Sequence, residues 1–157
     1  GYYAVGLSLK AKCEQIHAFD TDPWARKACK EMAQLNGVGS KLAIHGFCSP
    51  VWIEKHLKSN SLIISDCEGY ESVLFSKPKI HLYKNCDLII EIHDKPPSMD
   101  HSIAQNLSET HNITIIPSIP HHPTDYPQIS FLNQKEAEMC VDDRRQPWQG
   151  WIYAKRK

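Results

Sequence analysis

Three features are missing from this sequence of 157 residues: an excess of one charge, a long apolar run and closely spaced cysteines. Its 18 basic residues balance its 18 acidic ones, so no overall field attracts nucleic acid or an anionic membrane. The longest apolar runs, such as residues 88–90, are far too short to span a bilayer, and no signal peptide is recognisable. We therefore expect a soluble, cytoplasmic protein with neither a nucleic-acid nor a membrane partner.

The six cysteines include no C-x-x-C pair, which argues against a zinc site built from cysteines. Without a secretory signal, a chain of this length is expected to keep its thiols free. The length itself favours one domain with a hydrophobic core, and we expect residues 1–157 to form it.

Short apolar stretches alternate with segments of helical periodicity along the chain. The expected strands cover residues 15–20, 41–46, 61–66, 86–94, 112–116 and 150–155. The expected helices lie within 21–37, 50–57 and 99–107, and the proline-rich stretch 117–127 is a loop. This alternation predicts an α/β fold with a Rossmann-like, mainly parallel sheet that is covered by helices on both faces.

The stretch "TDPWARKACKEMAQLNG" is the clearest helix in the sequence. Asp22 is its expected N-cap, Pro23 suits the first helical position, and Asn36 with Gly37 is the expected stop. Asp20 precedes this cap and is not needed for it, so a functional role is the better interpretation of that carboxylate.

Polar side chains gather where the apolar strands end, at Asp20, Asp66, Glu68, Glu91 and His93. In open α/β sheets ligands bind beyond the carboxyl ends of the strands, so these residues predict a site there. Structural alternatives stay open for three of them. Asp66 or Glu68 could stabilise the N-terminus of the next helix, and His93 could be a strand-end histidine with a satisfied hydrogen bond.

Four stretches taken together resemble a class I S-adenosylmethionine-dependent methyltransferase: "GYYAVGL", "IHAFDTDPWARKACKEMAQLNGV", "LIISDCEGYESVLF" and "DLIIEIHD". The acid-x-Glu-Gly-x-Glu stretch is most similar to the FkbM-like branch, whose members are mostly O-methyltransferases. The resemblance covers roughly residues 1 to 95. It departs from the family at the start, since the first strand and its glycine-rich turn would precede residue 1.

The resemblance implies which residues surround the cofactor, S-adenosylmethionine. Asp20 matches the carboxylate that accepts from both ribose hydroxyls, and Asp66 matches the residue near the positively charged methionine end. The other implied cofactor contacts are Gly1, which matches the last glycine of the turn, Thr21, and Phe47 and Cys48 near the adenine.

A hydroxyl is a poor nucleophile until a base removes its proton, and Glu68, Glu91 and His93 are the candidates for that base. The predicted reaction is O-methylation of a hydroxyl on a small molecule or sugar. An alternative is that the acid cluster holds a divalent metal, but the sequence offers no recognised ligand spacing, so we assign no metal ligand.

Two other functions compete with a methyltransferase. A non-catalytic remnant or binding domain of the same fold would explain the missing first strand. An NAD-dependent dehydrogenase would also place an acid after its second strand, but it does not predict the Asp-x-Glu-Gly-x-Glu stretch.

In the family the missing strand lies between the strands that end at Asp20 and Asp66. Unpaired edges there favour one of three outcomes: the two strands pair directly, another segment or a second copy of the chain fills the slot, or the isolated chain is unstable. Residues 2–9 alternate in polarity and could supply the substitute strand, although they match a helix in the family.

Overall fold

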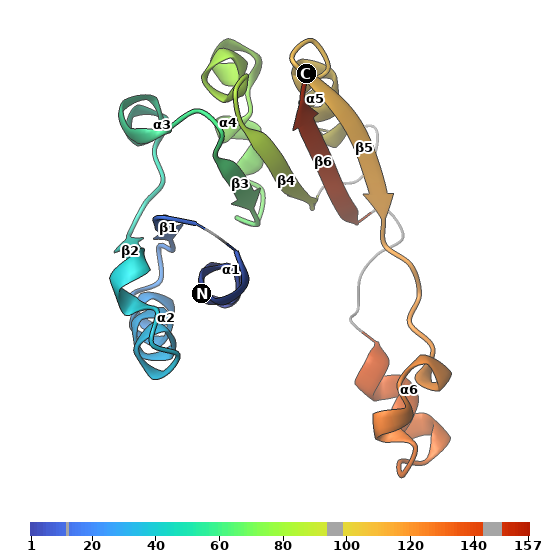
Figure 1. Ribbon diagram of the computed structural model, residues 1–157. Coiled ribbons are helices and arrows are strands. Elements are labelled where there is room, and N and C mark those ends of the chain that lie inside the picture. The colour runs from blue at the N-terminus through green and yellow to red at the C-terminus, as the bar shows by residue number, and fades with distance from the viewer. Residues whose placement is uncertain (12, 94–98, 143–148) are drawn as a thin grey trace. The chain divides into compact units, whose positions relative to one another are not determined.

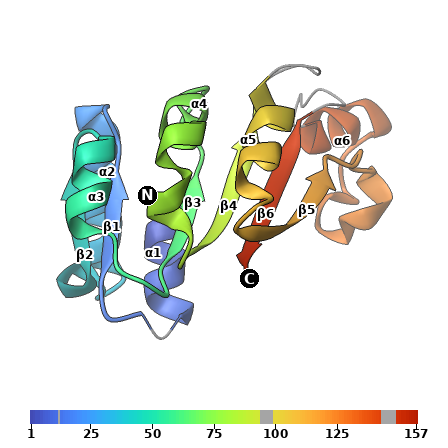
Figure 2. The same cartoon turned by 90° about the horizontal axis from the view of Figure 1, so that it is seen from above.

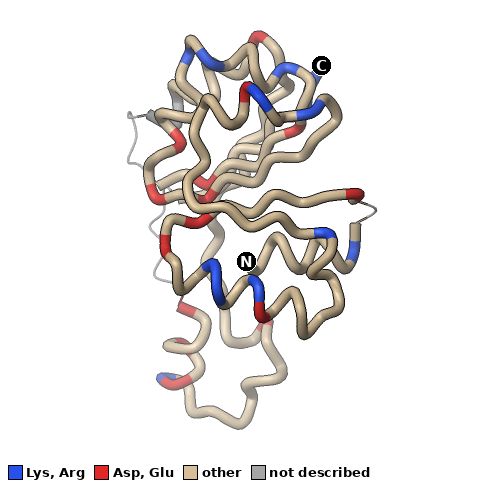
Figure 3. Tube along the Cα trace, turned by 90° about the vertical axis from the view of Figure 1, so that its left-hand side faces the viewer, with Lys and Arg blue, Asp and Glu red and all other residues tan. Residues whose placement is uncertain are grey.

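The computed structural model describes residues 1–11, 13–93, 99–142 and 149–157. The chain forms two compact units, Gly1–Leu57 and Lys58–Lys157, which are described one at a time below. That the units make up a single domain stays a prediction. No helix among the described residues is long and apolar enough to cross a membrane. All six cysteines are free thiols, as the sequence predicts. Basic and acidic residues are interspersed along the chain (Figure 3).

The first unit consists of a two-stranded parallel sheet and three α-helices (Figure 1). Its elements in chain order are α1 (Tyr2–Lys10), β1 (Ile16–Phe19), α2 (Pro23–Leu35), a 3₁₀ turn (Gly39–Lys41), β2 (Leu42–His45) and α3 (Pro50–His56).

Helices cover both faces of this small sheet, as the fold class requires. Trp52 of α3 contacts the rings of His17, Phe19 and His45, which share one face because side chains alternate along a strand. The other face carries Leu42, which packs on a core supplied by α1 and α2. The buried residues of that core are Val5 of α1, Ala33 of α2 and Val38, which follows α2.

Side-chain caps fix where α2 and α3 begin. Asp22 Oδ1 accepts from the Trp24 amide at 2.9 Å, and Ser49 Oγ accepts from the Trp52 amide at 3.1 Å. A proline follows each cap at the first helical position, where its missing N–H costs nothing. The predicted start of α2 is therefore confirmed.

The second unit contains a four-stranded sheet and the remaining helices. Its elements in chain order are β3 (Leu62–Ser65), α4 (Glu71–Leu74), a 3₁₀ helix (Lys77–Tyr83), β4 (Asp87–Ile92), α5 (Met99–Leu107), β5 (His111–Pro117), 3₁₀ turns (Pro123–Asp125 and Pro127–Ile129), α6 (Gln134–Val141) and β6 (Gly150–Arg156).

The strand order is β3-β4-β6-β5, with the last strand of the chain, β6, between β4 and β5 (Figures 1 and 2). β3 and β4 are parallel, whereas β6 is antiparallel to both of its neighbours. The α/β class and the Rossmann-like arrangement are confirmed. The second sheet is mixed rather than purely parallel, because the chain returns through β6 in the opposite direction.

The core of this unit lies on one face of the sheet. Leu88 and Ile90 on β4 are fully buried, and so are Ile152 and Ala154 on β6, which lie opposite them in register. α5 packs on the β5–β6 side of the sheet (Figure 2) and contributes two further core residues. These are Ile103 and Leu107. Burial of this apolar face holds β4 rigidly in the sheet, and β4 carries residues of the candidate site.

One expectation from the sequence is wrong. Residues 2–9 do not form a substitute strand but lie in α1, where the buried positions Val5 and Ser8 are three residues apart, as on one face of a helix. β1 pairs with β2 and β3 with β4. Direct pairing of β1 with β3, which belong to different units, stays a prediction. Pairing of these edges with a second copy of the chain stays a prediction.

α6 was not expected, although its start is encoded locally. Asn133 and Glu136 form a capping box in which each side chain accepts from the other residue's amide, at 3.0 and 3.1 Å. The proline-rich stretch 117–127 is irregular apart from 3₁₀ turns, as predicted. The predicted end of the fourth strand, Asp94, lies outside the described residues.

The start of β6 gives a test of the sheet. A Cβ at Gly150 would collide with the carbonyl oxygen of Ile116 on β5, and backbone cannot yield as a flexible side chain does. We expect Gly150→Ala to lower the free energy of unfolding by about 1–3 kcal/mol in urea denaturation. The matched control is Gly6→Ala in α1, where nothing lies within 4 Å of the added atom. It should raise stability by about 0.5–1 kcal/mol. Equal effects of the two substitutions would contradict the close approach.

Candidate functional site

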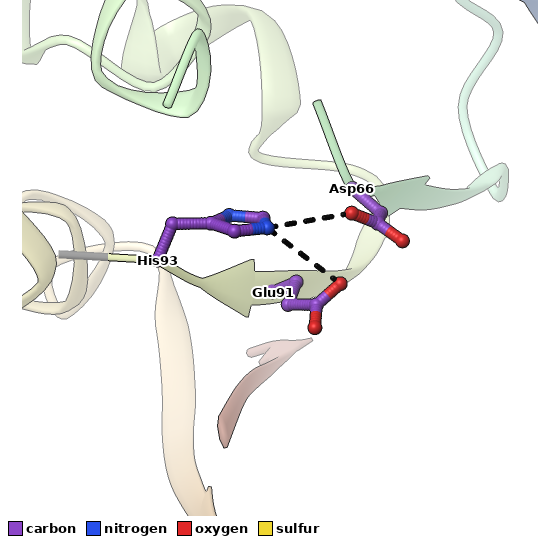
Figure 4. Close-up of side chains that lie close together, drawn as sticks. All are labelled: Asp66, Glu91 and His93. Atoms are coloured by element: carbon purple, nitrogen blue, oxygen red, sulfur yellow. Dashed lines mark ion pairs between the residues drawn. The ribbon is translucent and has the colours of Figure 1, made fainter. Parts of the chain in front are cut away.

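The candidate site lies at the carboxyl ends of β3 and β4. Ser65 is paired with Ile90 in the parallel register, so the next residues, Asp66 and Glu91, follow at the same edge of the sheet. His93 comes two residues after Glu91, directly beyond β4. In Figure 4 the imidazole of His93 faces the carboxylates of Asp66 and Glu91.

The turn that follows β3 is held by the side chain of Glu71. Glu68 and Gly69 have positive φ angles of 53° and 101°, a conformation that costs a non-glycine residue energy. Glu71 Oε1 accepts from the Cys67 amide at 2.7 Å, and its Oε2 accepts from the Gly69 amide at 2.8 Å. One carboxylate therefore bridges two backbone donors and keeps Glu68 in its left-handed conformation.

Glu71 stays ionised although it is buried. Burial pushes the pKa of this carboxyl up, but the amides of Cys67, Gly69 and Glu71 itself outweigh that effect and leave the pKa below its ordinary value. Glu71 thus supplies a fixed negative charge beneath the site.

Four carboxylates surround the ring of His93. Its Nε2 lies 3.5 Å from Asp66 Oδ1, 3.6 Å from Glu68 Oε2 and 3.9 Å from Glu91 Oε2. On the other side, Nδ1 lies 3.7 Å from Glu71 Oε1, and this buried nitrogen has no hydrogen-bond partner in the described part of the chain. All four separations exceed normal hydrogen-bond lengths, so the ring is placed by packing and charge.

Exposure rises across this acid–histidine cluster from the sheet toward solvent. The side chains of Glu71 and Glu91 are 5% exposed and that of His93 is 14% exposed, whereas Asp66 reaches 36% and Glu68 87%. The cluster therefore has a buried floor and an open side formed by Asp66 and Glu68.

Burial first, and then a hydrogen bond and repulsion from Glu91, raise the pKa of Asp66 to about 6. His93 acts in the opposite direction but does not cancel these effects. Asp66 therefore keeps its proton to a higher pH than an ordinary aspartate does. The arrangement can take up a proton from a ligand, attract a cation, or bind a metal ion through the donor atoms of Asp66, Glu91 and His93, which lie within 4.8 Å of one another.

Cys67 lies in the same turn but is not a nucleophile. Burial raises the pKa of its thiol to about 12, and the sulfur lies 3.3 Å from Ser65 Oγ. The thiol is therefore protonated at neutral pH.

In the first unit, the predicted cofactor residues follow the ends of β1 and β2. Asp20 has a structural role that the sequence analysis denied, since its Oδ1 accepts from the Asp22 amide at 2.9 Å. Arg26 Nη1 donates to the backbone carbonyls of Asp20 and Thr21 at 2.8 and 2.9 Å. These bonds fix the turn between β1 and α2 and leave one carboxylate oxygen of Asp20 for a ligand.

The residues after β2 differ in their surroundings. Phe47 is exposed, whereas burial raises the pKa of the neighbouring Cys48 thiol to about 11, so that it stays neutral. Gly1 is the N-cap of α1, and an added Cβ would come within 2.7 Å of Cys29 in α2. Close packing explains a glycine there, and the role of Gly1 in cofactor binding stays a prediction.

Within the second unit the structure thus brings together four of the predicted site residues, Asp66, Glu68, Glu91 and His93. Gly1, Asp20, Thr21, Phe47 and Cys48 belong to the first unit. Sequence reasoning missed Glu71. Glu71 is the last glutamate of the acid-x-Glu-Gly-x-Glu stretch. It follows Gly69 by two residues and Cys67 by four, a spacing that lets one carboxylate accept from both amides.

No family model and no curated protein matches the sequence. Among solved structures, a precorrin-8w decarboxylase of Methanobacterium thermoautotrophicum is similar, with a TM-score of 0.56 and 15% identity over 95% of this chain and 74% of that one. The MccD protein has a TM-score of 0.53 and 12% identity over 99% and 86%. A C5,15-methyltransferase domain for precorrin-6Y, described as putative, from Corynebacterium diphtheriae has a TM-score of 0.52 and 12% identity over 100% and 82%.

The chain shares its fold with these three proteins. At 12 to 15% identity the likeness extends to the fold alone, and it agrees with the class that the sequence resembles. The likeness therefore rests on the sheets and helices, and the chemistry has to be argued from the cluster of side chains.

The bridge made by Glu71 can be tested directly. In Glu71→Gln an amide nitrogen replaces one acceptor and faces a backbone N–H, so a buried donor loses its partner. We expect a loss of roughly 2 kcal/mol in the free energy of unfolding, measured by urea denaturation. The exposed Glu109→Gln should stay within about 0.5 kcal/mol of the wild type. An unchanged stability of Glu71→Gln would show that the bridge does not hold the turn.

The raised pKa of Asp66 predicts a pH dependence of stability. Because its pKa is about 6 when folded and 3.8 ordinarily, the folded state holds a proton that the unfolded state releases between these values. The stability from this group is therefore complete below the lower value and is lost as the pH rises through about 6. Asp66→Asn should gain stability relative to the wild type between pH 4 and 7 in urea titrations. Parallel stability curves for the two proteins would contradict the raised pKa of Asp66.

Proposed function

We propose that the protein is an S-adenosylmethionine-dependent O-methyltransferase, akin to the FkbM-like branch, that methylates a hydroxyl of a small molecule or sugar. The observation that carries this proposal is the acid–histidine cluster. It lies beyond the carboxyl ends of two parallel strands in a methyltransferase-like fold, where α/β proteins bind their ligands.

Within the first unit, four residues are suited to the ribose and adenine of the cofactor: Asp20, Thr21, Phe47 and Cys48. The carboxylate oxygen of Asp20 that does not cap the turn is suited to accept from the ribose hydroxyls, beside Thr21. Phe47 is exposed and Cys48 is neutral, which suits contact with the uncharged adenine. The negative charge around Asp66 suits the positively charged methionine end.

Methyl transfer forms a bond from the acceptor oxygen to the methyl carbon and breaks the bond from that carbon to sulfur. The sulfonium becomes a neutral thioether, and the hydroxyl proton leaves. In this proposal the cluster around His93 receives that proton, and Glu68 passes it to solvent because its side chain is 87% exposed. Glu91 and Glu71, which are buried, keep the imidazole in place.

The competing functions explain less of the site. A nicotinamide-dependent dehydrogenase would use Asp20 in the same way, but hydride transfer gives no role to four carboxylates around one imidazole. A binding domain without catalysis would need no exposed proton acceptor such as Glu68. The experiment below distinguishes such a domain from an enzyme.

The test is cofactor binding and turnover by the whole gene product. Isothermal calorimetry should show S-adenosylmethionine binding, and Asp20→Ala should weaken it by roughly 10- to 150-fold, since a hydrogen bond to a charged group contributes about 1.5–3 kcal/mol. The exposed Glu14→Ala is the control and should bind as the wild type does. No binding by the wild type would refute the proposal, and binding without S-adenosylhomocysteine release for any hydroxyl acceptor would favour a binding domain.

A further inference from the structure

We propose that Asp66, Glu91 and His93 form a binding site for a divalent transition-metal ion such as Mn²⁺ or Zn²⁺. The binding itself stands on the geometry of the second unit alone. Its consequence, that the ion holds the oxygen of the methyl acceptor, rests on the proposed function.

The separations within the cluster match ligands of one ion better than they match hydrogen bonds. Two ligands that each lie about 2.1 Å from a metal are about 3.0 Å apart when adjacent and about 4.2 Å apart when opposite in an octahedron. His93 Nε2 lies 3.5 Å from Asp66 Oδ1 and 3.9 Å from Glu91 Oε2, between these limits. The three side chains already surround one point from two neighbouring strand ends (Figure 4).

The other ring nitrogen provides an independent indication. Metal-bound histidines usually donate their second N–H to a carboxylate, which fixes the tautomer. Nδ1 of His93 is buried without a hydrogen-bond partner among the described residues, and the nearest carboxylate oxygen, Oε1 of Glu71, is 3.7 Å away. Glu71 cannot move toward it freely, because the amides of Cys67 and Gly69 hold both of its oxygens. A shift of the ring on binding an ion at Nε2 would complete this bond.

The charge of the site also calls for a cation. Four carboxylates lie within 4 Å of a single imidazole, and the side chain of Glu91 is only 5% exposed. Buried carboxylates need a compensating cation or a proton. Two carboxylate oxygens with one imidazole nitrogen favour a transition metal over Ca²⁺, which prefers oxygen alone.

The open side of the cluster leaves coordination positions for a substrate. Asp66 and Glu68 border solvent, so an acceptor hydroxyl can reach the ion from that side. A bound metal lowers the pKa of a ligated hydroxyl, and Glu68 is close enough to remove the proton. Acceptors with two adjacent oxygens, such as vicinal diols, would bind best because they can chelate the ion.

The experiment uses Mn²⁺ and electron paramagnetic resonance on the whole protein. Loss of the free Mn²⁺ signal should reveal one site, and spin-echo modulation should show coupling to a histidine nitrogen in the wild type. Glu91→Gln and His93→Ala should weaken binding at least tenfold, and His93→Ala should remove the nitrogen coupling. The exposed His81→Ala and Glu109→Gln should bind Mn²⁺ as the wild type does.

Each outcome decides the proposal. No Mn²⁺ or Zn²⁺ binding by the wild type, or binding without nitrogen coupling, would overturn it, and the nitrogen signal needs no variant that has to fold. Equal binding by His93→Ala and His81→Ala would overturn it as well. Calorimetry with S-adenosylmethionine alone, without metal, separates the two proposals. Cofactor binding by a protein that does not bind metal refutes only the metal site. Metal binding by a protein that does not bind the cofactor refutes only the methyltransferase.

Discussion

The candidate site depends on one interaction, the bridge from the carboxylate of Glu71 to the amides of Cys67 and Gly69. The bridge holds Glu68, a non-glycine residue with positive φ, in a conformation that costs it energy. The bridge places Glu68 toward solvent and sets a fixed negative charge next to Nδ1 of His93. The side chain of Glu71 thus both fixes the backbone of the turn and places a negative charge beside His93.

The packed sheet supplies the second half of the site. The apolar face of β4 is anchored against β6 and α5, and this holds Glu91 and His93 beside the turn after β3. Burial, and then the neighbouring buried Glu91, raise the pKa of the Asp66 carboxyl at this strand end. Such an arrangement costs stability unless a proton or a cation is present, and this cost is the physical reason to seek a ligand at this point.

Local signals made much of the fold predictable. Asp22 with Pro23 marks the start of α2 through hydrogen bonds between near neighbours, and the apolar run of β3 needs no distant partner to be recognised. α6 and the antiparallel direction of β6 were missed for different reasons. The capping box of α6 was present but lies in a polar stretch, whereas strand direction depends on pairing between residues far apart in the chain.

By itself, the sequence determined that acids and a histidine follow the ends of apolar strands, because side-chain chemistry and hydrophobic periodicity are local properties. Only the tertiary structure decided which of them meet. The parallel register of β3 and β4 brings Asp66 to Glu91 and His93, residues that show no ligand spacing along the chain. It also decided that Glu71 holds the turn and that Asp20 gives one oxygen to a cap, since both roles depend on where backbone amides point after folding.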